Sequence, residues 1–188
     1  MTINLQEATN WMQAATSEPA RYIKADGRSF WSIIDSATVS FESDSTIIDS
    51  QGGLLSLGIK SGDIFSVNGS EHNDSNLFEV ESITDLTIMV TPESPAIIDE
   101  IEGNVTILGI SRYFTPTIDL NGDSPKDTWN DREHHISQKW HHFTWVPTAL
   151  DNHEPERGDE ILYIAKNQKY KIEHIFPNNG LQWTVVAR

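Results

Sequence analysis

Two stretches of this sequence, residues 62–90 and 158–186, carry the same succession of turn and strand residues about 96 positions apart. Each opens on a Gly-Asp pair, Gly62-Asp63 or Gly158-Asp159, and continues with apolar residues at alternate positions. Alternation with a period of two is typical of half-buried β-strands. Glycine followed by aspartate favours a tight turn, because glycine adopts positive φ and aspartate accepts a backbone hydrogen bond two residues on. Each stretch is therefore predicted to form a three-stranded antiparallel meander.

This repeat restricts the architecture, whether the two stretches share an ancestor or converged. A three-stranded meander cannot bury both of its faces alone, so each must curl into a small barrel or pack on other elements. Further strands are predicted from runs of β-branched and aromatic residues, and those of the first half are residues 30–34, 37–41, 64–67, 77–80, 86–90 and 105–110. A helical spacing of apolar residues occurs at residues 5–15. The predicted fold class is mainly β, with two small antiparallel β-barrel or sandwich modules, a short N-terminal helix and a long irregular connecting arm.

Composition divides the chain into four segments. Residues 1–28 are predicted to be the N-terminal helix and lead-in, and residues 29–111 an acidic β-module. Residues 112–153 form an arm rich in aromatic residues and histidine, and residues 154–188 a C-terminal meander that completes the core. The acidic module holds fourteen acidic residues and a single base, Lys60, which is a charge of −13 out of −15 for the whole chain. The excess charge is thus a property of one module.

This charge excludes some partners and leaves its own role open. A chain at −15 is poorly suited to bind nucleic acid or an anionic membrane, because both require a cationic surface. The carboxylates could line a passage that repels phosphate, lie outside and aid solubility, or bind divalent cations at subunit contacts. The chain has no cysteine, which excludes disulfides and thiol nucleophiles. It has no apolar run of membrane-spanning length and no basic start typical of a secretory signal, so we expect a soluble protein made in the cytosol.

The arm concentrates the residues with the richest chemistry. Two histidine pairs, His134-His135 and His141-His142, suggest a zinc or nickel site, but adjacent histidines point in different directions and no His-Glu-x-x-His spacing occurs. Histidines at a surface or interface are the favoured interpretation. The candidate interaction residues are Trp129, Trp140, His141, His142, Phe143 and Trp145. Their aromatic rings are compatible with an inter-subunit contact, with core packing beneath the arm, or with stacking on carbohydrate.

Motifs of catalysis are not found in the sequence. It contains no Gly-x-Ser-x-Gly elbow and no phosphate-binding glycine loop, and residues 119–127 match a calcium loop only in fragments. We therefore predict a protein that is not an enzyme, with no catalytic, cofactor-binding or metal residues and no cofactor.

Residues 47–107 carry a succession of turn and strand motifs, namely Gly52-Gly53-Leu54, Gly62-Asp63-Ile64, Val67-Asn68-Gly69-Ser70, Phe78-Glu79-Val80 and Gly103-Asn104-Val105. In these motifs the stretch resembles a module of tailed-bacteriophage virion proteins. The C-terminal stretch, with Gly158-Asp159, Tyr170-Lys171-Ile172 and Gly180-Leu181-Gln182-Trp183, resembles the closing barrel of small head-tail joining proteins, also called head completion or stopper proteins. Together the two matches cover about half of the chain. Tail-tube, baseplate and tail-tip proteins use similar modules.

This resemblance implies a structural subunit of a phage particle. The expected place is a ring in the neck or tail, made in the host cytoplasm and then part of the virion, that lines or surrounds the DNA path. The expected partners are further copies of the chain and neighbouring connector or tail proteins, with no sequence-specific contact to nucleic acid and none to a membrane. Two alternatives remain: a peripheral module that binds carbohydrate on the host surface, and a metal-dependent hydrolase built on the histidines.

Overall fold

The computed structural model describes residues 16–119, 141–176 and 182–188. It confirms a mainly β protein: strands make up 51% of the structure, and the described part contains no α-helix, only three short 3-10 helices. The predicted N-terminal helix, residues 5–15, lies outside the described residues. No helix in the described ranges has the length and apolar character needed to cross a membrane.

The chain forms two compact units. One is Ile23–Tyr113, here called the inserted unit, and the other combines Met1–Tyr22 with Phe114–Arg188 and is called the terminal unit. Fifteen acidic residues and four bases give the inserted unit a charge of −11, and the terminal unit carries the remaining −4. One contiguous stretch of sequence therefore interrupts the terminal unit and carries most of the charge.

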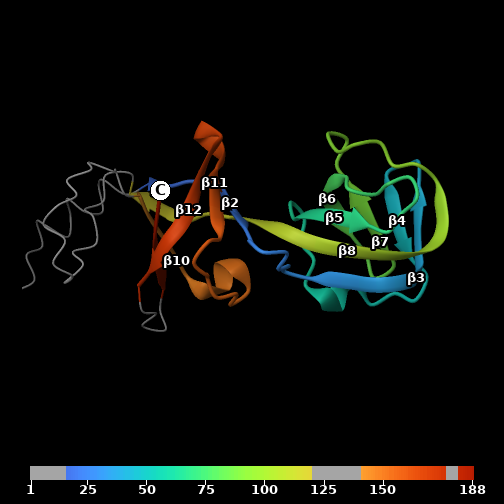
Figure 1. The fold of residues 1–188 in the computed structure, drawn as a ribbon, viewed down its shortest axis with the longest axis horizontal. Coiled ribbons are helices and arrows are strands. Elements are labelled where there is room, and N and C mark those ends of the chain that lie inside the picture. Colours follow the sequence, from blue (N-terminus) through green and yellow to red (C-terminus); the bar gives the residue numbers. More distant parts are fainter. Residues whose placement is uncertain (1–15, 120–140, 177–181) are drawn as a thin grey trace, which may run out of the picture. The chain divides into compact units, whose positions relative to one another are not determined.

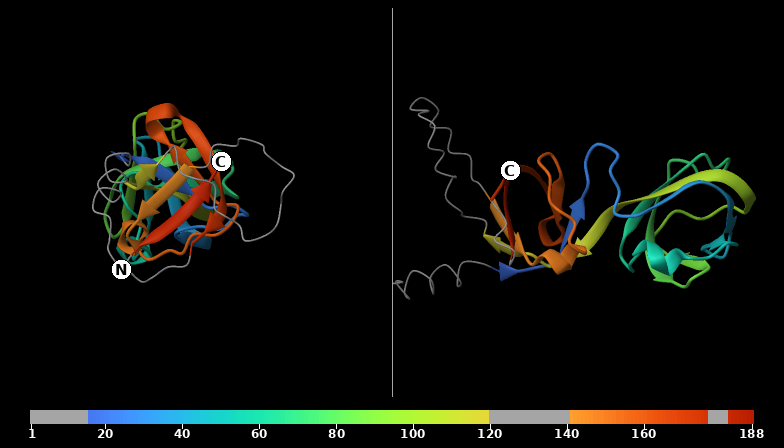
Figure 2. Two further views of the ribbon diagram at one scale, coloured as in Figure 1. Left: turned by 90° about the vertical axis from the view of Figure 1, so that its left-hand side faces the viewer. Right: turned by 90° about the horizontal axis from the view of Figure 1, so that it is seen from below.

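The inserted unit is a closed barrel of six antiparallel strands. Its strands are β3 (Ser32–Glu42), β4 (Thr46–Asp49), β5 (Ile64–Asn68), β6 (Leu77–Ile83), β7 (Thr87–Val90) and β8 (Glu100–Phe114). They pair in the order β3–β4–β7–β6–β5–β8, and β8, the long yellow-green strand of Figure 1, pairs again with β3. The right-hand view of Figure 2 shows these strands curving round the interior. Closure leaves the barrel without a fully unpaired edge strand.

Apolar side chains from all six strands fill the barrel. The buried positions alternate along each strand and include Val39, Phe41, Ile47, Phe65, Val67, Phe78, Val80, Ile88, Val90, Val105 and Ile107. Phe65 stacks on Phe78 with ring centroids 5.5 Å apart, and Trp31 lies 5.7 Å from Phe65. Gly109 on β8 makes room for Trp31, because a Cβ at this position would lie 2.3 Å from the indole ring.

The described part of the terminal unit contains seven short strands. They are β1 (Thr16–Ser17), β2 (Ala20–Ile23), β9 (Thr117–Asp119), β10 (His141–Trp145), β11 (Glu160–Tyr163), β12 (Gln168–Ile175) and β13 (Trp183–Ala187). They pair in the order β1–β9–β10–β13–β12–β11–β2. Only Glu18 and Pro19 separate β1 from β2, so one segment of the chain forms both ends of this series. Pro19 lacks the N–H that an uninterrupted strand would use here.

Both predicted meanders are confirmed. Strands β5, β6 and β7 pair in succession in the inserted unit, and β11, β12 and β13 do so in the terminal unit. The glycine of each Gly-Asp pair has positive φ, 83° at Gly62 and 98° at Gly158, as the turn argument requires. A short 3-10 helix precedes each turn: η1 (Leu54–Leu57) in the inserted unit and η2 (Pro147–Leu150) in the terminal unit. The third, η3 (Ile164–Lys166), follows β11.

The predicted irregular arm, residues 112–153, is wrong for most of its described residues: β8 runs to Phe114, and Thr117–Asp119 form β9. Residues 141–145 form β10, which pairs with β9 and β13, and η2 follows. The segment His-His-Phe-Thr-Trp does alternate polar and apolar residues, and the side chains of Phe143 and Trp145 are buried. This period-two pattern is a strand signal that the density of aromatic residues conceals.

Candidate functional site

Asp63 lies fully buried at the start of β5 and is the centre of a polar cluster inside the inserted unit. Its Oδ2 accepts hydrogen bonds from Trp31 Nε1 (2.8 Å) and from the backbone N–H of Lys60 (3.1 Å). Arg112 donates from Nε to Oδ1 (3.0 Å) and from Nη2 to Oδ2 (2.7 Å), and Nη2 also reaches the carbonyl of Gly58 (2.7 Å). Arg112 is only 2% exposed, so this two-pronged ion pair is shielded from water. The cluster is a structural staple of the barrel.

Asp159 is built in the same way in the terminal unit. It is also fully buried, and its Oδ2 accepts hydrogen bonds from Tyr22 Oη (2.6 Å) and from the backbone N–H of Glu156 (3.1 Å). In each unit the aspartate thus binds an aromatic side chain from an earlier part of the chain and the N–H three residues before it. The Gly-Asp repeat therefore extends to the atomic contacts.

Tyr163 fastens the β1–β2 segment to the terminal unit. At the end of β11, its hydroxyl hydrogen-bonds the carboxylate of Glu18. This bond, together with burial, raises the pKa of Tyr163 to about 12. Burial alone raises the pKa of Tyr170 on β12. Both tyrosines therefore remain neutral and act as packing residues.

The surface of the inserted unit is strongly acidic. Among the carboxylates of this unit whose exposure the structure describes, ten are exposed: Asp26, Asp35, Glu42, Asp44, Glu71, Asp74, Glu81, Asp85, Glu93 and Asp99. Of its four bases only Lys60 is exposed, since Lys24 and Arg28 are half-buried and Arg112 lies inside. Exposed acidic side chains of this unit thus greatly outnumber exposed basic ones.

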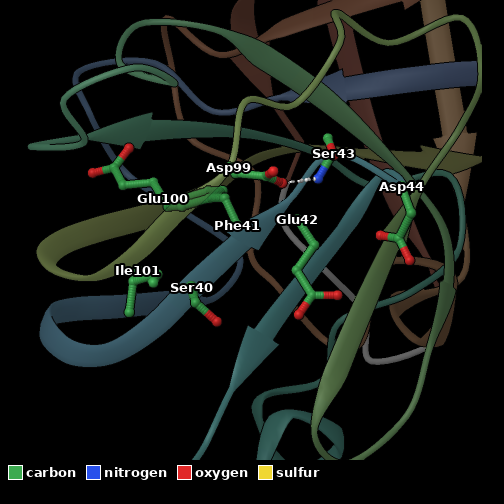
Figure 3. A pocket seen from close by; sticks show the side chains of 8 residues that line it. All are labelled: Ser40, Phe41, Glu42, Ser43, Asp44, Asp99, Glu100 and Ile101. Atoms are coloured by element: carbon green, nitrogen blue, oxygen red, sulfur yellow. Dashed lines mark hydrogen bonds between the residues drawn. The ribbon is translucent and has the colours of Figure 1, made fainter.

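An open depression of about 620 Å³ gathers four carboxylates beside the β3–β4 turn. Its lining is Ser40, Phe41, Glu42, Ser43, Asp44, Asp99, Glu100 and Ile101 (Figure 3). Asp99 accepts a hydrogen bond from the backbone N–H of Ser43 (2.6 Å), and Figure 3 shows the carboxylate of Glu100 turned away from Glu42 and Asp44. Within the described residues, no group of three or more His, Asp or Glu side chains is arranged to hold a metal ion. The depression offers an acidic surface without converging ligands.

Glu100 holds the loop between β5 and β6. Its carboxylate accepts hydrogen bonds from Ser70 Oγ (2.5 Å), from the backbone N–H groups of Glu71 (2.9 Å) and His72 (3.2 Å), and from Asn73 Nδ2 (3.3 Å). Partial burial raises the pKa of Glu100, but these hydrogen bonds outweigh it and leave the pKa below the ordinary value of 4.5. Glu100 is therefore a charged clamp on the loop.

This clamp predicts a pH-dependent stability. Because the folded pKa of Glu100 is lowered, its contribution is present above the ordinary value of 4.5 and is lost as pH falls through the folded pKa. Glu100→Gln is expected to lower the free energy of unfolding by about 1 kcal/mol at neutral pH, with the deficit shrinking in acid. Denaturant unfolding from neutral to acidic pH measures this difference. Glu81→Gln, an exposed change on β6, should match the wild type, and a deficit that is independent of pH would refute the clamp.

The candidate interaction residues fall into two groups. Trp129 and Trp140 lie outside the described residues. The other four lie on β10, where Phe143 is fully buried and Trp145 is 4% exposed. Trp145 packs edge-on against Phe114 and Tyr22, with ring centroids 5.3 and 5.9 Å away. Of the alternatives, core packing describes both Phe143 and Trp145.

The two histidines of β10 are half-buried and have aromatic neighbours. His141 lies edge-on to Tyr170 at 4.7 Å, and His142 lies 6.2 Å from Phe176. Successive residues of a strand project to opposite faces, so this pair cannot chelate one ion.

The sequence did not reveal Arg112 and Glu100 as key polar residues. Their hydrogen-bond partners, Asp63 and Ser70, lie 49 and 30 positions away in the chain.

Comparison with known proteins identifies no relative: no protein-family model matches the chain, and no curated protein or solved structure is detectably similar to it.

Proposed function

We propose that the chain is a structural subunit of a tailed-phage particle, in a ring of the neck or tail that surrounds the DNA path. The observation that carries the proposal is the surface of the inserted unit, where ten carboxylates are exposed and Lys60 is the only exposed base. DNA is retained by cationic surfaces, which release its counterions. An acidic barrel beside the path would let the phosphate backbone slide past without being trapped.

The proposal includes a second barrel module in the terminal unit. The order β9–β10–β13–β12–β11–β2 corresponds strand by strand to β3–β4–β7–β6–β5–β8 of the inserted unit. β2 is the last strand of this order, and β1, two residues before it in the chain, pairs with β9 at the other end. Arg112 of β8 donates to Asp63 and Tyr22 of β2 donates to Asp159, and β8 and β2 hold equivalent places in the two orders, which supports this equivalence. Two small stapled modules that need no disulfide would suit a part of a particle that keeps its shape outside the cell.

Assembly would depend on contacts between subunits. A closed ring uses head-to-tail interfaces, in which two different patches of each copy match. Trp129, Trp140, His141 and His142 are the proposed contact residues. Phe143 and Trp145 do not belong to this set, because both are buried in the core of the terminal unit.

Purified particles test the proposal directly. Particles induced from the strain that encodes the chain should contain it in a fixed number of copies each, measured by quantitative mass spectrometry. A nonsense codon in its gene should yield heads and tails that do not join, or tails that are incomplete, in electron micrographs. The matched control is a synonymous change at the same codon. Absence of the chain from purified particles, or normal particles from the nonsense strain, would overturn the assignment.

A further inference from the structure

Part of the barrel wall has an unpaired backbone edge. On the side away from β8, strand β3 pairs with β4 only from Val39 to Glu42, and one more bond joins Ser50 N–H to the carbonyl of Thr38. Among the described residues, no strand pairs with this side of residues 32–37. A strand edge of this kind can accept an additional strand from another chain.

This edge forms one wall of a groove of about 490 Å³. Residues 32–38 line it on the β3 side, and residues 51–53 with Ser56 and Leu57, from the turn and η1, line the opposite side. The carboxylate of Asp49 fixes the two walls, because Oδ1 accepts hydrogen bonds from Thr38 Oγ1 (2.7 Å) and from the backbone N–H of Gln51 (3.0 Å). The groove is therefore preformed.

A bulge at Asp35 is held from the opposite side. The residue has a φ of 48°, and the register between β3 and β8 shifts between Ile33 and Ser36. Asp35 N–H donates to Thr106 Oγ1 on β8 (3.1 Å), so the bulge is anchored without using the groove side. Bulges also discourage indiscriminate pairing at an edge, which fits an edge reserved for a particular partner.

The chemistry of the groove specifies its occupant. Ile34 is 66% exposed and Leu57 37% exposed, two large apolar side chains presented to solvent beside the edge. Asp35 is the exposed charge of the lining, and no base lines the groove. This surface repels anionic ligands, and it also repels a second copy of the acidic unit. It fits an extended segment with apolar side chains for Ile34 and Leu57 and a cationic one for Asp35.

We infer that this groove binds an extended, basic segment of a different protein, which adds a strand to the open edge of β3. Main-chain hydrogen bonds to residues 32–37 supply the strand pairing, and the two apolar side chains and Asp35 supply the preference for sequence. The exposed length of edge spans roughly 20 Å at about 3.3 Å per residue, so it takes a segment of about four to six residues. The inference does not rest on the phage assignment, and either can fail without the other.

Binding is tested with a labelled octapeptide of alternating lysine and valine, on the full chain at physiological ionic strength. Fluorescence anisotropy should show saturable one-to-one binding. An octapeptide of alternating glutamate and valine should not bind. The lysine peptide with every second amide N-methylated should also fail, because its main chain cannot pair along the edge while its charge is unchanged. No saturable binding, or equal binding of the methylated peptide, would overturn the inference.

Two variants with the same change of charge locate the site. Ile34→Lys should weaken binding at least about tenfold, which corresponds to about 1.4 kcal/mol, whereas Ile101→Lys should leave it unchanged. Ile101 is 88% exposed on β8 of the same unit, so both variants are expected to fold. In heteronuclear NMR spectra the peptide should shift amide signals of residues 32–38 and 51–57. Equal effects of the two variants, shifts centred on residues 99–101, or self-association of the chain that Ile34→Lys abolishes would each refute this occupant.

Discussion

Replacing Asp63 with asparagine is expected to destabilise the inserted unit by about 3 to 5 kcal/mol, the largest effect of any single change considered for this unit. The substitution keeps the shape of the side chain but removes the negative charge that both Nε and Nη2 of Arg112 contact. Arg112 is 2% exposed and would remain buried with its charge uncompensated. Denaturant unfolding, followed by the fluorescence of Trp31, whose indole N–H binds this carboxylate, measures the loss.

Two further variants make the Asp63 test specific. Asp44→Asn, an exposed change in the same unit, should alter the free energy of unfolding by less than about 0.5 kcal/mol. The double variant Asp63→Leu with Arg112→Met should recover much of the stability, since apolar replacement of both partners removes the uncompensated charge. A cost below about 1 kcal/mol for Asp63→Asn would show that the ion pair does not hold the barrel together.

Replacing Trp145 with alanine is expected to destabilise the terminal unit by about 3 to 5 kcal/mol, as for other large aromatic side chains removed from a core. The change deletes the ring that packs between Tyr22 and Phe114 and leaves a cavity where the side chain is now 4% exposed. Thermal unfolding followed by near-ultraviolet circular dichroism measures the loss. The neighbouring Val146→Ala is the control, because Val146 is 55% exposed.

The same experiment separates core packing from an interface role for Trp145. A residue of the core lowers the unfolding temperature of the isolated protein when it is truncated. A residue used only in assembly leaves that temperature unchanged and weakens association. An unchanged unfolding temperature of Trp145→Ala would therefore return this residue to the contact set with Trp129 and Trp140.

The two meanders could be predicted from the sequence because the residues that determine them lie close together in the chain. Each strand pairs with the next, and the turn at Gly62 or Gly158 needs only the conformational freedom of glycine and the following aspartate. Barrel closure depends instead on pairing of β8 with β3 and β5, which places Ile107 beside Ile33 and Val67. The alternation of apolar residues along a strand does not indicate with which distant strand it pairs.

The predicted boundaries of some strands were wrong for a related reason. Residues 30–34 and 37–41 were predicted as separate strands, but Ser32–Glu42 is one strand with a bulge at Asp35. The interruption in the pattern is real, and the backbone accommodates it by adopting positive φ while pairing with β8 continues beyond it. The open groove edge arises at the same interruption, so the sequence feature that obscured the strand also marks the proposed binding surface.

The interruption of the terminal unit by the inserted one has a consequence for synthesis. A ribosome that has reached Phe114 has produced all six strands of the inserted barrel, but of the described strands of the terminal unit it has produced only β1 and β2. The terminal unit is incomplete until β13 emerges, and β1 and β2 are made long before β9 and β11, the strands of this unit with which they pair. The brevity of β1 and β2, two and four residues long, limits the exposed edge that the nascent chain carries during that delay.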